Sequence, residues 1–132
     1  VRGLERMSEA TAIALDSNQP EAMIIPDTYH MFLAGTGPNA LGRLRGDFIA
    51  IFQFADAGKE VEPILHKGVD SQRVLPGDGK IDLKAYLTNL KKTGFVGCVS
   101  LELYNPEYRK REPVAFLEEA LRKTVKVVSS VG

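Results

Sequence analysis

Apolar residues recur at three- and four-residue spacing in several stretches, the pattern of helices with one face against a core. The first such stretch covers 4–15, and a shorter one lies around 40–44. Another begins after Asp82, a residue type that caps helices, and ends at Gly94. The last begins at Pro113, which suits the first turn of a helix. The pattern therefore predicts four helices along the chain.

Continuous apolar runs at 22–25, 48–56 and 96–103 predict three strands. Such runs are typical of parallel strands covered on both faces, and alternation with helices predicts right-handed βαβ units. Cys98, inside the third run, is expected to be a buried small residue. The segment 57–80 is polar, rich in Gly and Pro and without periodicity, so a long functional loop with an exposed His66 is expected.

Composition narrows the class of protein. The 132 residues include 17 basic and 17 acidic side chains, and zero net charge argues against a sequence-independent nucleic-acid binder. The apolar fraction of 44% fits one globular domain, and no apolar run is long enough for a membrane helix. A single Cys98 favours a reducing compartment, and we expect a cytoplasmic protein. The chain begins with Val1 rather than Met, so we expect it to be part of something longer.

Polar side chains stand near the carboxyl ends of the three predicted strands: Asp27, Gln53 and Glu102. In parallel α/β proteins that end of the sheet binds ligands, and three oxygen donors suit a hard divalent ion such as Mn²⁺ or Mg²⁺. His30 adds an imidazole just beyond Asp27. Each residue also has a structural interpretation, because an Asp after a strand often caps a helix and a Gln in a strand can bond a loop. The interpretation as one site depends on all three converging.

Four segments together resemble a known family: IIPDTYHMFLAG (24–35), FIAIFQFAD (48–56), RVLPGDGKIDL (73–83) and FVGCVSLELYNPEYRK (95–110). The chain resembles the C-terminal half of the xylose isomerase-like TIM-barrel superfamily, the sugar phosphate isomerase/epimerase group. The resemblance covers nearly the whole chain and implies an α/β fold, half of a (β/α)8 barrel. Residues 1–132 would form a single partial domain with about three strands and four helices.

The resemblance also implies roles for particular residues. Asp27, Gln53 and Glu102 match ligands of one divalent metal, for which we expect Mn²⁺, Mg²⁺ or Co²⁺. His30 matches a substrate-contacting position that takes part in proton transfer, and Arg73 one that reaches the substrate's oxygens. A fourth ligand, a Glu, and a base are expected on an earlier strand. Many members have His where this chain has Gln53, and Gln is typical of the branch with 3-dehydroshikimate dehydratases.

The function implied is a metal-dependent isomerase or epimerase that abstracts a proton next to a carbonyl of a small sugar or polyol-like substrate. The alternatives are a 3-dehydroshikimate dehydratase-like lyase and a catalytically silent fragment that binds a partner. DNA cleavage, also found in the superfamily, is disfavoured by the neutral charge and only two His. A half barrel leaves strand edges unpaired, so we expect a homo-oligomer or a missing N-terminal half.

Overall fold

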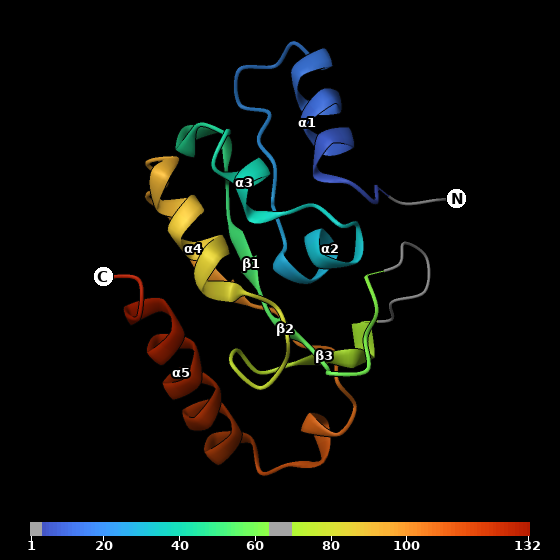
Figure 1. Cartoon of the computed structure of the whole chain (residues 1–132), viewed down its shortest axis with the longest axis vertical. Coiled ribbons are helices and arrows are strands. Elements are labelled where there is room, and N and C mark those ends of the chain that lie inside the picture. The colour runs from blue at the N-terminus through green and yellow to red at the C-terminus, as the bar shows by residue number, and fades with distance from the viewer. Residues whose placement is uncertain (1–3, 64–69) are drawn as a thin grey trace.

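The computed structural model describes residues 4–63 and 70–132, in which helices pack around a parallel pair of strands that continues into a short antiparallel pair (Figure 1). The helices are α1 (Met7–Asp16), α2 (Thr28–Leu33), α3 (Pro38–Leu41), α4 (Leu83–Lys92) and α5 (Pro113–Ser129). The strands are β1 (Phe52–Phe54), β2 (Asp56–Ala57), β3 (Arg73–Val74) and β4 (Val99–Leu101). Single turns of 3-10 helix lie at Gly46–Phe48, Asp70–Gln72 and Tyr108–Lys110. The exposure predicted for His66 concerns a residue outside the described ranges.

Three backbone segments lie side by side and parallel, as the apolar runs predict. The central strand β1 pairs with β4, with Gln53 opposite Ser100. On its other side, isolated parallel bridges join Ile24 to Ile49 and Asp27 to Gln53. The prediction of a parallel arrangement for these three segments is therefore confirmed.

The strands are shorter than the apolar runs suggest, and the run at 22–25 forms one isolated bridge, at Ile24, rather than a regular strand. Pro26 gives a physical reason, because proline has no N–H to donate to a ladder. Its carbonyl still accepts a hydrogen bond from the Gln53 N–H at 2.9 Å. The run at 48–56 is likewise divided, since it begins in the turn Gly46–Phe48 and breaks at Ala55 between β1 and β2.

The segment 57–80 is not simply a loop. Ala57 of β2 pairs antiparallel with Arg73 of β3, and Asp56 pairs with Val74. An antiparallel pair was not predicted, because strands of two residues are too short to show an alternating pattern. The pairing brings Arg73 to the end of the sheet that carries Gln53.

Helix α2, which is not among the four helices predicted from the sequence, begins directly after Asp27. The Asp27 carboxylate accepts hydrogen bonds from the N–H groups of Tyr29 and His30, at 2.8 and 3.0 Å, and so caps this helix. With six residues, α2 is too short to show an amphipathic repeat. The structural interpretation of Asp27 as a helix cap is therefore correct.

The longer helices begin and end close to the predicted positions. Asp82 caps α4 by accepting from the Ala85 N–H at 3.0 Å, and Gly94 follows this helix with φ of +75°. Pro113 occupies the first turn of α5. Helix α4 contacts both α3 and α5, and Figure 1 shows it beside α5. These termini follow from local capping chemistry, which is why they could be predicted.

The two faces of the sheet differ in burial. Phe52 and Phe54 are fully buried in one apolar cluster with residues of α4. Met23, Ile25 and Ile51, which alternate with residues of that buried face, are 44%, 52% and 37% exposed. The described helices therefore cover only one face of the sheet completely.

Cys98 is exposed, which corrects the prediction of a buried thiol. It comes directly before β4, which pairs only with β1 among the described residues and so forms an edge of the sheet. An apolar run does not distinguish an edge strand from a central one. None of the described helices is both long and apolar enough to cross a membrane.

The buried hydroxyl of Thr28 provides a test of how α2 is attached to the sheet. Thr28 Oγ1 donates to the Ala55 carbonyl at 2.7 Å and accepts from the Ala55 N–H at 3.0 Å, where the strand is interrupted. Thr28→Val leaves both backbone groups unsatisfied and should lower the free energy of unfolding by about 1 to 3 kcal/mol in urea denaturation. Thr88→Val, at an exposed site on α4, is the matched control and should change stability little. Equal stability of the two variants would contradict the proposed attachment.

Candidate functional site

The three residues predicted as metal ligands lie on neighbouring backbone segments at one end of the sheet. Asp27 and Gln53 are bridge partners, and the Glu102 N–H donates to the carbonyl of Phe54 at 3.1 Å. Ser100 pairs with Gln53, and alternation along the strand gives Glu102 the same face as Ser100. The structure therefore brings Asp27, Gln53 and Glu102 to one end and one face of the sheet.

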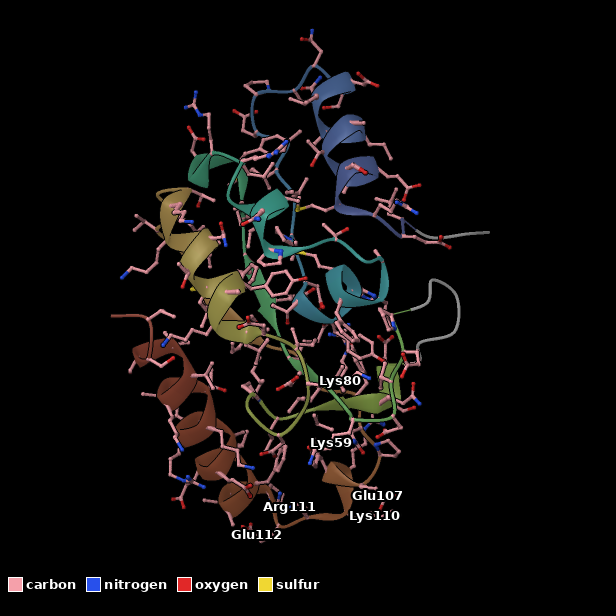
Figure 2. All side chains as sticks on the ribbon, viewed as in Figure 1. Lys59, Lys80, Glu107, Lys110, Arg111 and Glu112 are labelled. Carbon is pink, nitrogen blue, oxygen red and sulfur yellow. The ribbon has the colours of Figure 1, made fainter. Side chains whose placement is uncertain are left out.

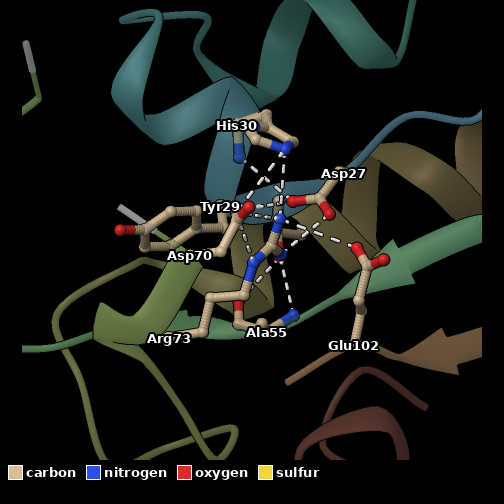
Figure 3. Close-up of polar contacts among 8 residues, drawn as sticks. Asp27, Tyr29, His30, Ala55, Asp70, Arg73 and Glu102 are labelled. Atoms are coloured by element: carbon tan, nitrogen blue, oxygen red, sulfur yellow. Dashed lines mark hydrogen bonds and ion pairs between the residues drawn. The ribbon is translucent and has the colours of Figure 1, made fainter. Parts of the chain in front are cut away.

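The guanidinium of Arg73 lies at the centre of this group (Figure 3). Its side chain is only 1% exposed, and Nη1 lies 2.8 Å from Asp27 Oδ2. Nη2 lies 3.6 Å from Glu102 Oε2 and 3.1 Å from His30 Nε2. Arg73 thus contacts Asp27 and His30 at the start of α2 and Glu102 after β4, which are two separate parts of the chain.

Two further residues hold the guanidinium, and neither was singled out from the sequence. Asp70 Oδ1 accepts from Arg73 Nε at 3.2 Å, and the ring of Tyr29 lies 4.6 Å from the guanidinium carbon (Figure 3). A buried aromatic face adds cation–π attraction to the ion pairs. The only local sequence signal for the pair of Asp70 and Arg73 is their spacing of three residues. The pair lies in a segment without periodicity, so this spacing does not stand out.

The charge on Arg73 sets the ionisation of Asp27. Burial raises the pKa of the Asp27 carboxyl, but the Arg73 charge and the hydrogen bond from the His30 N–H lower it by more. The net result is a pKa below the ordinary aspartate value. Asp27 is therefore a carboxylate at neutral pH.

Glu102 behaves in the opposite way. Burial and a side-chain hydrogen bond with Asp27 raise the pKa of the Glu102 carboxyl, and attraction to Arg73 offsets only part of this rise. Two acidic groups beside one guanidinium do not ionise independently, because each disfavours charge on the other. The pair binds a proton more readily than two separate carboxyl groups would.

The contact with Arg73 also determines which ring nitrogen of His30 is protonated. A guanidinium has donors only, so the 3.1 Å contact requires the lone pair of His30 Nε2. We therefore assign the ring proton to Nδ1. The His30 side chain is 58% exposed and lies in the first turns of α2, so it can reach a bound small molecule.

A cavity of about 470 Å³ adjoins the site. Asp27, His30 and Gln53 line it together with apolar residues of α1, such as Met7, and Ile25 of the strand segment. Three of the predicted site residues therefore face one common space beside the end of the sheet.

The donor set fits a hard divalent cation by its chemistry. Asp27 and Glu102 are carboxyl groups that both contact Arg73, and Gln53 adds an amide oxygen on the segment between them. In the described ranges, no three carboxylate, imidazole or thiol side chains are grouped as a metal site requires. A cation here would therefore depend on the amide of Gln53.

The buried ion pair predicts how stability changes with pH. Asp27→Asn removes the charge opposite Arg73, whose side chain is 1% exposed, and should cost roughly 3 to 5 kcal/mol in urea unfolding at pH 7. The pKa of Asp27 in the folded protein lies below the unfolded value of about 3.9. The charged carboxylate therefore contributes its full share to the free energy of unfolding at any pH well above that value. The contribution disappears as the pH falls through the folded pKa, so the parent and the variant should converge in acid.

Asp47→Asn is the matched control for this prediction. Asp47 pairs with Arg45 at the surface, where its side chain is 65% exposed, and the substitution should change stability little at either pH. A penalty for Asp27→Asn that stays constant from neutral pH into acid would contradict the assignment of a charged Asp27.

Known proteins resemble this chain in both sequence and fold. The family model described as xylose isomerase-like TIM barrel matches residues 2–123. The inosose isomerase of Bacillus subtilis (strain 168) is 36% identical over 121 residues, covering 92% of this chain and 42% of that protein. A 3-dehydroshikimate dehydratase of Pseudomonas putida is 32% identical over 97 residues, covering 70% of this chain and 14% of that protein.

Among solved structures, the IolI protein with a bound zinc atom superposes with a TM-score of 0.88 at 31% identity, covering 97% of this chain. The alignment covers 45% of IolI, so this chain spans less than half the length of such relatives. The fold predicted from the sequence, a partial barrel with parallel strands and helices, is thereby confirmed. The chain belongs to the xylose isomerase-like TIM-barrel family.

Proposed function

We propose that this chain supplies part of the active site of a divalent-metal-dependent enzyme that isomerises a cyclic polyol ketone of the inosose class. The observation that carries the proposal is the meeting of Asp27, Glu102 and His30 around Arg73, beside Gln53, at one end of a parallel sheet. Inosose isomerases that align with over nine-tenths of this chain support the substrate class.

In this proposal Asp27, Gln53 and Glu102 hold the cation through oxygen atoms. When bound, such an ion acts as a Lewis acid that stabilises negative charge on a carbonyl oxygen while the neighbouring carbon loses a proton. The zinc atom bound by IolI supports a divalent metal, and Mn²⁺, Mg²⁺ and Co²⁺ remain our candidates for this chain. Asp27 is already charged and oriented by its contacts with α2, which suits it to this role.

His30, which is 58% exposed, would contact the substrate directly, and Arg73, which is 1% exposed, would do so by exchanging one of its present partners for a substrate oxygen. A guanidinium donates to substrate oxygens without accepting a proton, so Arg73 can orient a polyol ketone and balance charge on it. In the assigned tautomer, His30 carries a proton on Nδ1 while Nε2 faces Arg73. The Nδ1–H can therefore donate a hydrogen bond to a substrate oxygen. When a substrate replaces the contact with Arg73, the Nε2 lone pair can accept the proton that leaves one carbon and return it to another, which an isomerisation requires.

We further propose that residues 1–132 act as one partial barrel domain completed by other protein. The resemblance implies a fourth ligand and a base from an earlier strand, which must come from an additional segment or from a second copy in a homo-oligomer. The exposed Met23, Ile25 and Ile51 share a face with Asp27 and Gln53, and this is the face that such a segment would cover.

A second candidate is a lyase that dehydrates 3-dehydroshikimate. Gln53, typical of that branch, and the 32% identity to the Pseudomonas putida enzyme favour it. The first step, proton abstraction next to the carbonyl, would be the same in both reactions. The β-hydroxyl would then leave as water, at the step at which an isomerase returns the proton to carbon. Substrate shape distinguishes the two, so both compounds belong in the same assay.

The metal site can be tested by removing one ligand. Glu102→Gln, in the protein as the cell makes it, should weaken Mn²⁺ binding in titration calorimetry by roughly a hundredfold or more, because a charged oxygen ligand is lost. Turnover of an inosose and of 3-dehydroshikimate should fall with it, and EDTA should abolish parent activity.

Glu107→Gln is the matched control. Glu107 lies beyond β4 and forms a surface ion pair with Lys110 at 2.6 Å (Figure 2), so this variant should bind metal like the parent. If neither substrate reacts and Mn²⁺ does not bind the parent, the enzyme proposal is wrong. The chain would then be a catalytically silent binding module.

The state of assembly gives a further prediction. Residues 1–132 alone should either associate, as measured by light scattering, or fail to unfold cooperatively in urea. The reason is that the half-covered sheet exposes apolar side chains. A cooperatively folded monomer of 14.5 kDa would contradict the need for further protein to cover this face.

A further inference from the structure

The carboxylate of Asp56 lies outside the candidate site and accepts hydrogen bonds from four backbone amides. Asp56 is 2% exposed. Oδ1 accepts from the N–H groups of Ala57 and Ile81, both at 2.9 Å. Oδ2 accepts from those of Gly77 and Gly79, at 3.1 and 3.0 Å. Three of the four donors belong to the turn that follows β3.

This turn closes tightly on the carboxylate. A Cβ at Gly79 would lie 2.1 Å from the Ala57 carbonyl oxygen and 2.4 Å from Asp56 Oδ1, so no other residue fits without movement. Gly77 has φ of +87°, a conformation that other residues rarely adopt. The Lys80 N–H also donates to the Ala57 carbonyl at 3.1 Å. The two glycines of the PGDG motif thus allow the chain to wrap around Asp56.

The wrapped turn controls the position of β3, which carries Arg73. Asp56 is the β2 residue opposite Val74, and its carboxylate binds the chain three residues after Val74, at Gly77. Asn105 and Tyr108 hold β3 as well. Asn105 Nδ2 donates to the Arg73 carbonyl at 3.1 Å, and the Tyr108 hydroxyl accepts from the Leu75 N–H at 3.2 Å. The backbone around Arg73 is therefore held by side chains of two other segments.

We propose that Asp56 is a positioning residue that holds the guanidinium of Arg73 at the site through the turn 77–81. Arg73 reaches Asp27, Glu102 and His30 at once, and these contacts require its backbone to stay within a fraction of an ångström. Only a carboxylate can accept all four N–H groups, because an amide would turn an NH₂ group toward two of them. The inference rests on the proposed substrate role of Arg73.

The direct test is hydrogen exchange measured by NMR on Asp56→Asn. The Nε–H of Arg73 and the N–H groups of Gly77 and Gly79 should exchange about tenfold faster than in the parent, because local opening becomes easier. The control is Asp78→Asn, the same substitution in the same turn, where Asp78 pairs instead with Lys123 at the surface. Equal exchange at Arg73 in the two variants would overturn the proposal.

A kinetic test separates positioning from general stability. In the protein as the cell makes it, Asp56→Asn should raise KM for the inosose about tenfold. In an Arg73→Lys background the same substitution should add little, because the group that it positions is gone. Full additivity of the two changes would overturn the proposal. If the parent transforms neither an inosose nor 3-dehydroshikimate, the proposed function fails while the exchange measurement still decides the role of Asp56.

A milder variant covers the case in which Asp56→Asn does not fold. Asn105→Asp keeps the oxygen that accepts from the Glu107 N–H and removes the donor to the Arg73 carbonyl. It should accelerate exchange of the Arg73 Nε–H in the same direction. Unchanged exchange in this variant would show that support from neighbouring segments does not position Arg73.

Discussion

The ion pair between Asp27 and Arg73 is the interaction on which this structure depends most. It joins the start of α2 to β3, 46 residues later in the chain, with both side chains almost fully buried. A buried guanidinium is costly unless its donors are partnered, and here Asp27, Asp70, Glu102 and His30 partner them. The same contacts keep Asp27 charged and leave Glu102 inclined to bind a proton. Stability and candidate chemistry therefore depend on one side chain.

The parts of the fold that could be predicted are those determined by nearby residues. Asp82, Gly94 and Pro113 mark helix ends through contacts within a few positions, and apolar runs indicate the parallel segments. Helix α2 and the β2–β3 pair could not be predicted, because each is too short for a periodic signal and depends on distant partners. Cys98 shows a related limit, since burial at a sheet edge depends on what lies beside it.

The candidate site, like the fold, could be predicted from the sequence only in part. The chemistry of the side chains and a family resemblance were enough to select Asp27, Gln53, Glu102, His30 and Arg73, which the fold gathers at one end of the sheet. Tyr29, Asp70 and Asp56 could not be selected, because their significance comes from contacts that only the folded chain creates. A buried Asp in an apolar run has the same sequence pattern whether it binds a ligand or a turn.

Asp27 is at once the last residue bridged to the sheet and the cap of a helix. The two N–H groups of α2 hold one oxygen of its carboxylate, and Arg73 holds the other. The side-chain entropy that a flexible aspartate would lose on binding a ligand is therefore lost already when the chain folds. Any cation or donor that reaches this carboxylate meets a rigid group, so its affinity is not reduced by the cost of ordering the side chain.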